Sequence, residues 1–218
     1  YVLDEGRRSG VSHVVDHDSA DPLQSQEEIG PAVQLGENRL QDALRRKQAL
    51  GTDAEQGRWR FIGHLQTNKA KHIPGNFAWF HTLDSLKLAD RLVRHCRARE
   101  VELNALIQVN ISNDPDKHGL PADRVFGFIE QLLAAGHPGL VLRGLMTIGQ
   151  RGAVIAERQR EFAALRELSE ACTTRFGRSG FLELSMGMSS DFELAIREGA
   201  SIVRIGSAIF GPRPLPPA

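Results

Sequence analysis

Lysine is scarce in this chain of 218 residues, and none occurs in the first 46 positions. Against twenty-two arginines there are five lysines, namely Lys47, Lys69, Lys71, Lys87 and Lys117. A lysine amine can form an imine with an aldehyde, whereas an imidazole cannot. Any chemistry that needs a covalent link to a carbonyl compound therefore depends on very few positions in this sequence.

Other absences narrow the class of protein further. The two cysteines, Cys96 and Cys172, lie in helix-like segments without CxxC spacing, which argues against a disulfide framework or a thiolate metal cluster. No apolar run approaches the roughly 20 residues needed to cross a bilayer, and no signal-peptide pattern opens the chain. The 27 basic and 27 acidic residues cancel, so no overall field attracts nucleic acid or an anionic membrane. We expect a cytoplasmic protein that binds a small molecule.

Short apolar runs alternate with longer amphipathic ones along the chain, which is typical of βα units. The predicted strands are 11–15, 32–36, 59–63, 77–83, 105–111, 140–146, 181–186 and 202–205. The predicted helices between them are 37–50, 85–99, 121–135, 153–176 and 190–198. We predict a single α/β domain over residues 1–218, a (β/α)8 barrel of the TIM type. A doubly wound open sheet has the same local signature and stays open as an alternative.

In a barrel, ligands bind where the carboxyl end of each strand meets the following loop. These junctions are polar here, and they read GENRLQ (36–41), GHLQTNKAK (63–71), QVNIS (108–112), GLMTIG (144–149), SMGMSSD (185–191) and RIGSAIFG (204–211). The last two motifs, SMGMSSD and RIGSAIFG, combine small residues, hydroxyls and an arginine, Arg204. They follow the seventh and eighth predicted strands, and in barrels the loops after these strands commonly bind phosphate. The pattern favours a phosphate site, although ordinary turns share this composition.

Six motifs together resemble the pyridoxal phosphate (PLP) homeostasis protein family over about residues 32 to 212. They are GENRLQ, FIGHLQTNK, QVNISNDPDKHG, GLMTIG, ELSMGMSSD and IVRIGSAIFG, in the family's order. The resemblance implies a fold-type III PLP barrel, similar to the N-terminal domain of alanine racemase, without the second β-rich domain of the racemases. It further implies a monomer or weak dimer that buffers PLP or delivers it to apo-enzymes, with no established catalytic turnover.

The resemblance also implies which residues bind the cofactor. These are Arg204, Gly206, Ser207, Ser185, Met188, Ser189, Asn38 and Met146, the last two lining the pocket. Arg204 would face the pyridine nitrogen, Gly206 and Ser207 would contact the phosphate, and Ser185 with the Met188 and Ser189 region would complete the phosphate cup. An arginine at the ring nitrogen disfavours protonation there and weakens the electron sink, which suits a carrier better than a versatile catalyst.

The Schiff-base lysine of the family is missing from this sequence. The family carries it near the end of the first strand, and counting back nineteen residues from Gly36 gives His17. Three explanations stay open: noncovalent or absent PLP binding, an altered N-terminal sequence, or another lysine such as Lys69 or Lys117. The last would make the chain a racemase-like or lyase-like PLP enzyme. The segment before Val11 is also too short for the family's long N-terminal helix.

The stretch SHVVDHDSADP (12–22) has a second interpretation as a metal site. Its imidazole and carboxylate groups suit zinc, manganese or non-haem iron, and His13, His17 and Asp21 would make a two-histidine, one-carboxylate set for a metal-dependent hydrolase. A polar strand end followed by a turn explains the same residues, and we expect no metal. Three other histidines near strand ends can donate to a ligand or simply complete the core: His64, His72 and His81.

Overall fold

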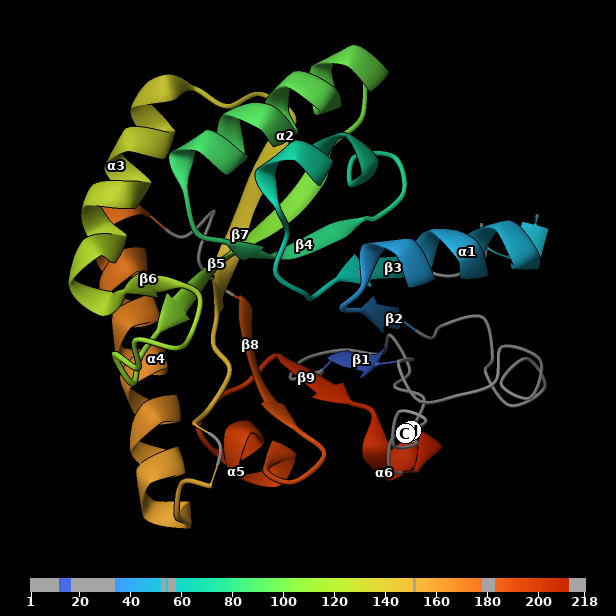
Figure 1. The fold of residues 1–218 in the computed structure, drawn as a ribbon. Helices are drawn as coiled ribbons and strands as arrows, with labels where there is room; N and C mark the ends of the chain where they lie inside the picture. Colours follow the sequence, from blue (N-terminus) through green and yellow to red (C-terminus); the bar gives the residue numbers. More distant parts are fainter. Residues whose placement is uncertain are drawn as a thin grey trace.

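The strands of this protein form one sheet that closes on itself (Figure 1). The structure, a computed structural model, describes residues 12–16, 34–51, 54, 58–150, 152–177 and 183–211, with the backbone alone for 12–16. The strands are β1 (Ser12–Asp16), β2 (Gln34–Glu37), β3 (Arg58–Phe61), β4 (Trp79–Leu83), β5 (Leu103–Asn110), β6 (Leu120–Pro121), β7 (Leu140–Met146), β8 (Glu183–Met188) and β9 (Ile202–Ile205). Their order is β4-β3-β2-β1-β9-β8-β7-β5-β6, and a further pairing of β4 with β5 closes the ring.

All of the strand pairings are parallel, and the two-residue β6 lies outside the ring of eight. The helical segments are α1 (Leu40–Leu50), η2 (Thr67–His72), α2 (Leu86–Arg99), η3 (Ala122–Arg124), α3 (Val125–Ala135), α4 (Ile155–Phe176), α5 (Phe192–Arg197) and α6 (Ser207–Phe210). Helices α1 to α5 lie outside the ring in Figure 1. The predicted (β/α)8 barrel is confirmed. The parts of predicted strands at 11, 32–33 and 181–182 lie outside the described residues.

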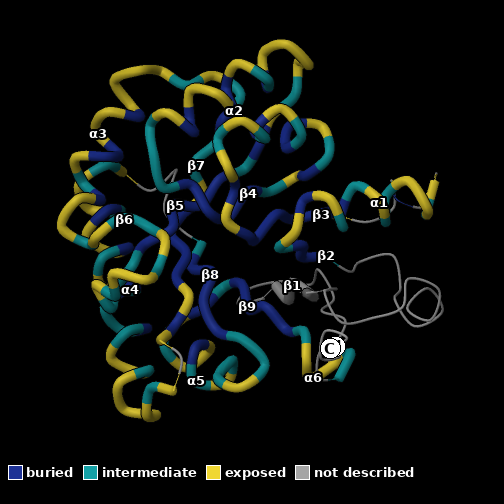
Figure 2. The backbone as a smooth tube through the Cα atoms, in the orientation of Figure 1, coloured by how far each residue is buried: buried dark blue, intermediate teal, exposed yellow. Residues whose placement is uncertain are grey.

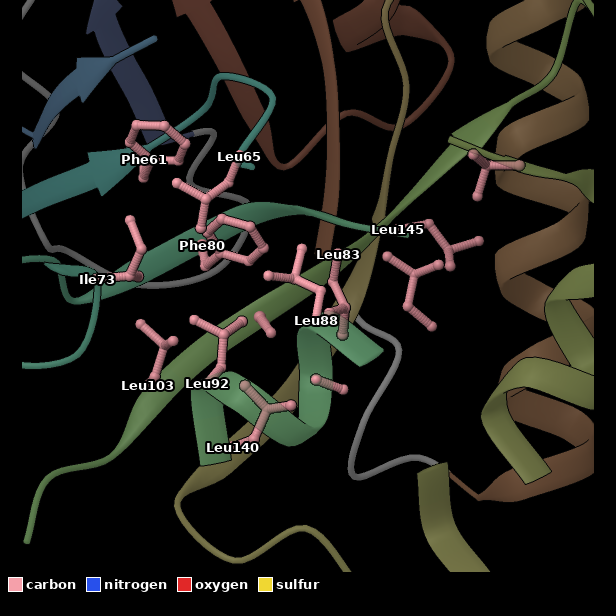
Figure 3. Close-up of a cluster of buried hydrophobic side chains, with 14 of the residues drawn as sticks. Phe61, Leu65, Ile73, Phe80, Leu83, Leu88, Leu92, Leu103, Leu140 and Leu145 are labelled. Atoms are coloured by element: carbon pink, nitrogen blue, oxygen red, sulfur yellow. The ribbon is translucent and has the colours of Figure 1, made fainter. Parts of the chain in front are cut away.

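The larger core fills the space between the outer face of the ring and the helices. Figure 3 shows Phe80 of β4 and Leu103 of β5 beside Leu88 and Leu92 of α2. On α2 the buried positions recur every three or four residues, which is the apolar stripe of a helix on a sheet: Leu88, Ala89, Leu92, Val93 and Cys96. Figure 2 shows the strands as buried and the outer faces of the helices as exposed. Each fully buried leucine contributes about 2 kcal/mol by removal from water.

A second, smaller cluster lies on the opposite face of the strands, inside the ring. It consists of Ile62, Leu106, Met146 and Ile202, with Trp79 packed against it. Because side chains alternate along a strand, a residue two positions from a member of this cluster points to the same side. Arg204 therefore faces the lumen with Ile202, while Val203 and Ile205 belong to the outer core. The lumen is thus partly apolar and partly charged.

Both cysteines are free and buried, Cys96 on α2 and Cys172 on α4, so the expectation that they form no disulfide is confirmed. Burial raises the pKa of each thiol to about 11. None of the helices in the described ranges is long and apolar enough to cross a membrane.

Candidate ligand site at the carboxyl end of the barrel

Arg204 on β9 is fixed inside the ring by two hydrogen bonds. Its Nη1 donates to the hydroxyl oxygen of Ser185 on β8, and its Nη2 donates to the carbonyl oxygen of Thr147 after β7, both at 2.8 Å. Arg204 is 5% exposed and Ser185 is fully buried. The backbone N–H of Thr147 donates in turn to the carbonyl of Ser185 at 3.1 Å. Three successive strands of the ring therefore hold one guanidinium in place.

His81 on β4 reaches the same hydroxyl from another part of the ring. Its Nδ1 lies 3.1 Å from Oγ of Ser185, although β4 and β8 are not paired, so this contact crosses the lumen. The ring of His81 is fully buried, and its Nε2 has no hydrogen-bond partner. Burial, followed by the charges of Arg60 and Arg204, holds the pKa of His81 well below its usual range. The imidazole is therefore neutral at physiological pH.

A second guanidinium, that of Arg60 on β3, is also buried. It lies over the ring of Trp79, 4.2 Å from the ring centroid. Burial lowers the pKa of Arg60 to about 10, so the group stays charged at neutral pH. Its Nε and Nη1 make no hydrogen bond. The carboxylate of Glu183 acts on Arg60 and raises its pKa, which partly offsets the effect of burial. Arg60 and Arg204 together bring two guanidiniums to the lumen, and such groups attract an anionic ligand.

The turn after β8 brings a hydroxyl to two backbone amides of the β9–α6 segment. Oγ of Ser189 accepts hydrogen bonds from the N–H groups of Gly206 at 3.1 Å and of Ala208 at 3.2 Å. Two N–H groups that converge on one oxygen form the kind of concavity that binds anions. The hydroxyl of Ser189 thus ties the turn after β8 to the β9–α6 segment and orients both N–H groups.

An ion pair on the outer side fixes this turn. Asp191 accepts a hydrogen bond from the N–H of Met188 at 2.6 Å through Oδ1, and its Oδ2 pairs with Arg158 of α4. Gly187 makes the close approach possible, because a Cβ there would lie 2.5 Å from Cβ of Ala195 on α5. Its φ of +89° is also unfavourable for other residues. The position of Ser189 is therefore set by α4 and α5 as well as by β8.

The predicted pocket residues Asn38 and Met146 lie elsewhere on the inner face. Asn38 follows β2, is half-buried, and has an Oδ1 without a partner. A Cβ at Gly63 would lie 1.9 Å from the carbonyl oxygen of Asn38, so glycine lets the ends of β2 and β3 meet. Met146 is fully buried in the apolar lumen cluster. Ser207 is exposed at the start of α6.

The structure divides the predicted site into two groups. Ser185 lies with Arg204, whereas Ser189 lies with Gly206, so Ser185 and Ser189 do not share a hydrogen-bond network in the described residues. Sequence reasoning missed Arg60 and Thr147, and it gave His81 no specific role. The expected lysine position, His17, lies outside the described residues. In β1 Asp16 pairs with Gly36, so position 17 directly follows the carboxyl end of that strand.

Potential metal ligands meet at the same end of the barrel. Donor atoms of His64, Asp84 and His118 lie within 4.8 Å of one another. The two imidazoles stack with centroids 3.6 Å apart and planes 6° apart, so their lone pairs lie in two separate, nearly parallel planes, which is poor geometry for binding one ion. The metal ligands predicted from sequence are not tested, because His17 and Asp21 lie outside the described residues and the side chain of His13 is not described.

A hollow of about 520 Å³ opens on the flank of the barrel beside the Ser189 turn. Side chains from the start of α4 and from α5 line it, among them Ile155, Arg158 and Arg197. Ser189, Ser190 and Asp191 of the turn also line it, whereas Arg204 and Gly206 do not, so the hollow adjoins the Ser189 turn and is separate from the polar group in the lumen.

The fold and the two polar groups define a parallel (β/α)8 barrel protein with a buried guanidinium in its lumen and two converging backbone N–H groups after its last strand. The chain belongs to the family described as "Alanine racemase, N-terminal domain", which it matches over residues 19–214. Within it, the chain belongs with the pyridoxal phosphate homeostasis proteins. The protein of that name from Pseudomonas aeruginosa is 43% identical over 179 residues, which cover 82% of this chain and 74% of the relative.

Solved structures support the same assignment. The structure of PipY from Synechococcus elongatus with PLP bound is 32% identical, has a TM-score of 0.84, and is matched over 92% of each chain. Alanine racemase from Clostridium difficile 630 is 13% identical with a TM-score of 0.72, over 98% of this chain and 54% of that chain. This second likeness is one of fold alone.

Proposed function

We propose that this chain binds PLP noncovalently in the barrel and serves PLP homeostasis by buffering the cofactor or delivering it to apo-enzymes. The observation that carries the proposal is the buried guanidinium of Arg204, held by Ser185 and Thr147 at the end of the barrel that binds ligands in this fold. The names of the relatives and the PLP bound to PipY support the same ligand.

The phosphate of PLP fits the Ser189 turn. The N–H groups of Gly206 and Ala208 converge on the hydroxyl oxygen of Ser189, whose own proton can be donated to a ligand, and the exposed Ser207 begins α6 in the same segment. The Met188 N–H is taken by Asp191, which leaves Met188 a role in the shape of the turn rather than as a donor. We propose that Ser189, Gly206 and Ser207 hold the phosphate, with Asn38 and Met146 beside the ring.

The pyridine nitrogen fits Arg204. When bound, PLP supplies an electron-withdrawing ring that is most effective with a protonated ring nitrogen. A guanidinium donates and cannot accept, so Arg204 keeps that nitrogen unprotonated. We assign Ser185 to the orientation of Arg204 instead of to the phosphate, because its hydroxyl is fully buried against the guanidinium. These features favour storage of PLP over catalysis.

The competing function, a PLP enzyme that uses another lysine, has less support from the site. Lys117 lies on the loop after β5, where its ammonium donates to the hydroxyl of Ser112 at 3.2 Å and lies 3.9 Å from the carboxylate of Asp114. Its amine is therefore engaged by two side chains of its own loop. Lys69 belongs to η2, between β3 and β4.

A PLP titration of the whole chain tests the proposed function. The native chain should bind one equivalent, and Arg204→Gln should lower the affinity at least tenfold, since it removes a charged donor worth about 1.5–3 kcal/mol. Arg197→Gln is the matched control, because Arg197 is an exposed arginine of α5. Equal affinities in all three proteins, or no stoichiometric binding by the native chain, would refute the proposal.

A further inference from the structure

Four groups form an unbroken polar chain across the lumen. The carbonyl of Thr147 accepts from Arg204, Arg204 also donates to Ser185, and the hydroxyl of Ser185 meets Nδ1 of His81. The chain joins β4, on one side of the lumen, to the segment after β7 and to β8 and β9 on the other. Every member is at most 5% exposed, so water does not compete for these bonds.

The position of each proton follows from what the members can do. Arg204 can only donate, so the oxygen of Ser185 accepts from it. The hydroxyl proton of Ser185 is then available to Nδ1 of His81, which must carry a lone pair to receive it. A neutral imidazole with a lone pair on Nδ1 holds its proton on Nε2. In this arrangement the chain runs in one direction, from Arg204 through Ser185 to His81, and the Nε2–H of His81 has no acceptor among the described residues.

The surroundings of His81 keep it in that form. The charged groups that face it are the guanidiniums of Arg60 on β3 and Arg204 on β9, and both oppose a further positive charge. The indole of Trp79 lies beside the ring, with centroids 6.0 Å apart. A protonated His81 would carry a proton on Nδ1 and would donate to the oxygen of Ser185, which already accepts from Arg204. The hydroxyl proton of Ser185 would then have lost Nδ1 as its acceptor. The oxygen of Ser185 could still accept from Arg204, but its hydroxyl would turn toward another acceptor, and its orientation toward Arg204 would no longer be fixed.

We propose that His81 is a positioning residue for the ligand's ring nitrogen. By accepting the proton of Ser185, it orients the hydroxyl oxygen toward Arg204, and so fixes the guanidinium where it donates to the pyridine nitrogen and keeps that nitrogen unprotonated. The inference rests on the proposed binding of PLP. It adds a residue that does not touch the ligand and acts through two others.

The test uses two substitutions of His81 that differ in the one group the proposal needs. The amide oxygen of His81→Asn can replace Nδ1 as the acceptor, whereas His81→Leu provides no acceptor. Ser185→Ala interrupts the chain with the loss of a single oxygen and should behave like His81→Leu. His95→Leu is the control, because His95 lies on the outer helix α2. The probe is 4′-deoxypyridoxine 5′-phosphate, which keeps the ring nitrogen and phosphate but lacks the aldehyde.

The readout is the absorbance of the bound probe between about pH 5 and pH 8, which reports protonation of the ring nitrogen. In the native chain, His81→Asn and His95→Leu, the nitrogen should stay unprotonated over this range. In His81→Leu and Ser185→Ala its pKa should rise by about one unit, a tenfold change in proton affinity. If all variants bind the probe with the native titration, His81 has no positioning role, and PLP binding stands.

Other outcomes also decide the matter. If the pKa of the probe's ring nitrogen rises in His81→Asn as much as in His81→Leu, His81 contributes packing alone, and the positioning role is wrong. If the native chain does not bind the probe, the proposed function itself fails and the inference falls with it. If His81→Leu does not fold, Ser185→Ala gives the answer, since a native titration in that variant would contradict the chain of hydrogen bonds.

Discussion

The hydroxyl oxygen of Ser189 accepts a hydrogen bond from the backbone N–H of Gly206 at 3.1 Å, which ties the turn after β8 to the segment after β9. The N–H of Ala208 donates to the same oxygen at 3.2 Å. One side chain therefore sets the spacing of the two loops to which we assign the phosphate.

Ser189→Ala should lower PLP affinity about tenfold. The substitution removes a hydroxyl that organises two backbone donors, and each neutral hydrogen bond contributes about 0.5–1.5 kcal/mol. Ser190→Ala is the control, because Ser190 is exposed in the same turn. Both variants are compared by PLP titration and by urea unfolding. A Ser189→Ala variant with native affinity would remove this turn from the site.

The ion pair of Asp191 with Arg158 should support the same turn from outside. Asp191→Ala removes both the acceptor for Met188 and the partner of a largely buried guanidinium, so we expect a loss of about 3 kcal/mol in the free energy of unfolding. Asp191→Asn keeps an acceptor oxygen and should lose less. Urea unfolding measures both variants. Equal losses would mean that the bond to the Met188 N–H contributes nothing.

His17→Lys should create a covalent site for PLP. The sequence count places residue 17 where the family carries its lysine, and the pairing of Asp16 with Gly36 places it just beyond the end of β1. Borohydride reduction followed by peptide mapping should find PLP on residue 17. Asp18→Lys, one position further along, is the control. An adduct at residue 18 in preference to residue 17 would show that the assumed register is wrong.

The buried neutral state of His81 should make stability depend on pH. Because its pKa is lowered from 6.5 in the folded chain, the unfolded chain binds a proton below about pH 6.5 that the folded chain does not. Stability should therefore fall with falling pH, by up to about 1.4 kcal/mol per unit from this residue.

His81→Asn isolates that contribution, since His64, His72 and His95, whose pKa values are also lowered, remain in both proteins. Urea unfolding between about pH 5 and pH 7.5 should give a gap between the native chain and the variant that narrows as the pH falls. Parallel curves for the two proteins would mean that folding does not lower the pKa of His81.

Local patterns were enough to predict the barrel and to place several residues of the proposed site near the ends of strands. Ser189, Gly206 and Arg204 directly follow or end strands, and in a parallel barrel every strand ends on the same side, so their approximate place follows from the order of strands. The alternation of βα units similarly predicted each of helices α1 to α5 within a few residues.

The contacts across the lumen were not predictable, because they depend on which strands face each other after closure. Nothing in the local sequence around Ser185 indicated that its hydroxyl lies within hydrogen-bond distance of both Arg204 and His81 of β4. The pairing of β4 with β5 also shifts between Phe80 and Leu83. Leu83 consequently packs in the outer core, where simple alternation from Phe80 would turn it inward.

Noncovalent PLP binding in the barrel is the central claim, and native mass spectrometry before and after borohydride reduction tests it most directly. We predict a complex with one PLP in the native spectrum, and loss of that PLP when the reduced sample is denatured. A stoichiometric PLP adduct on Lys69 or Lys117 that survives denaturation, or the absence of any native complex, would contradict the account.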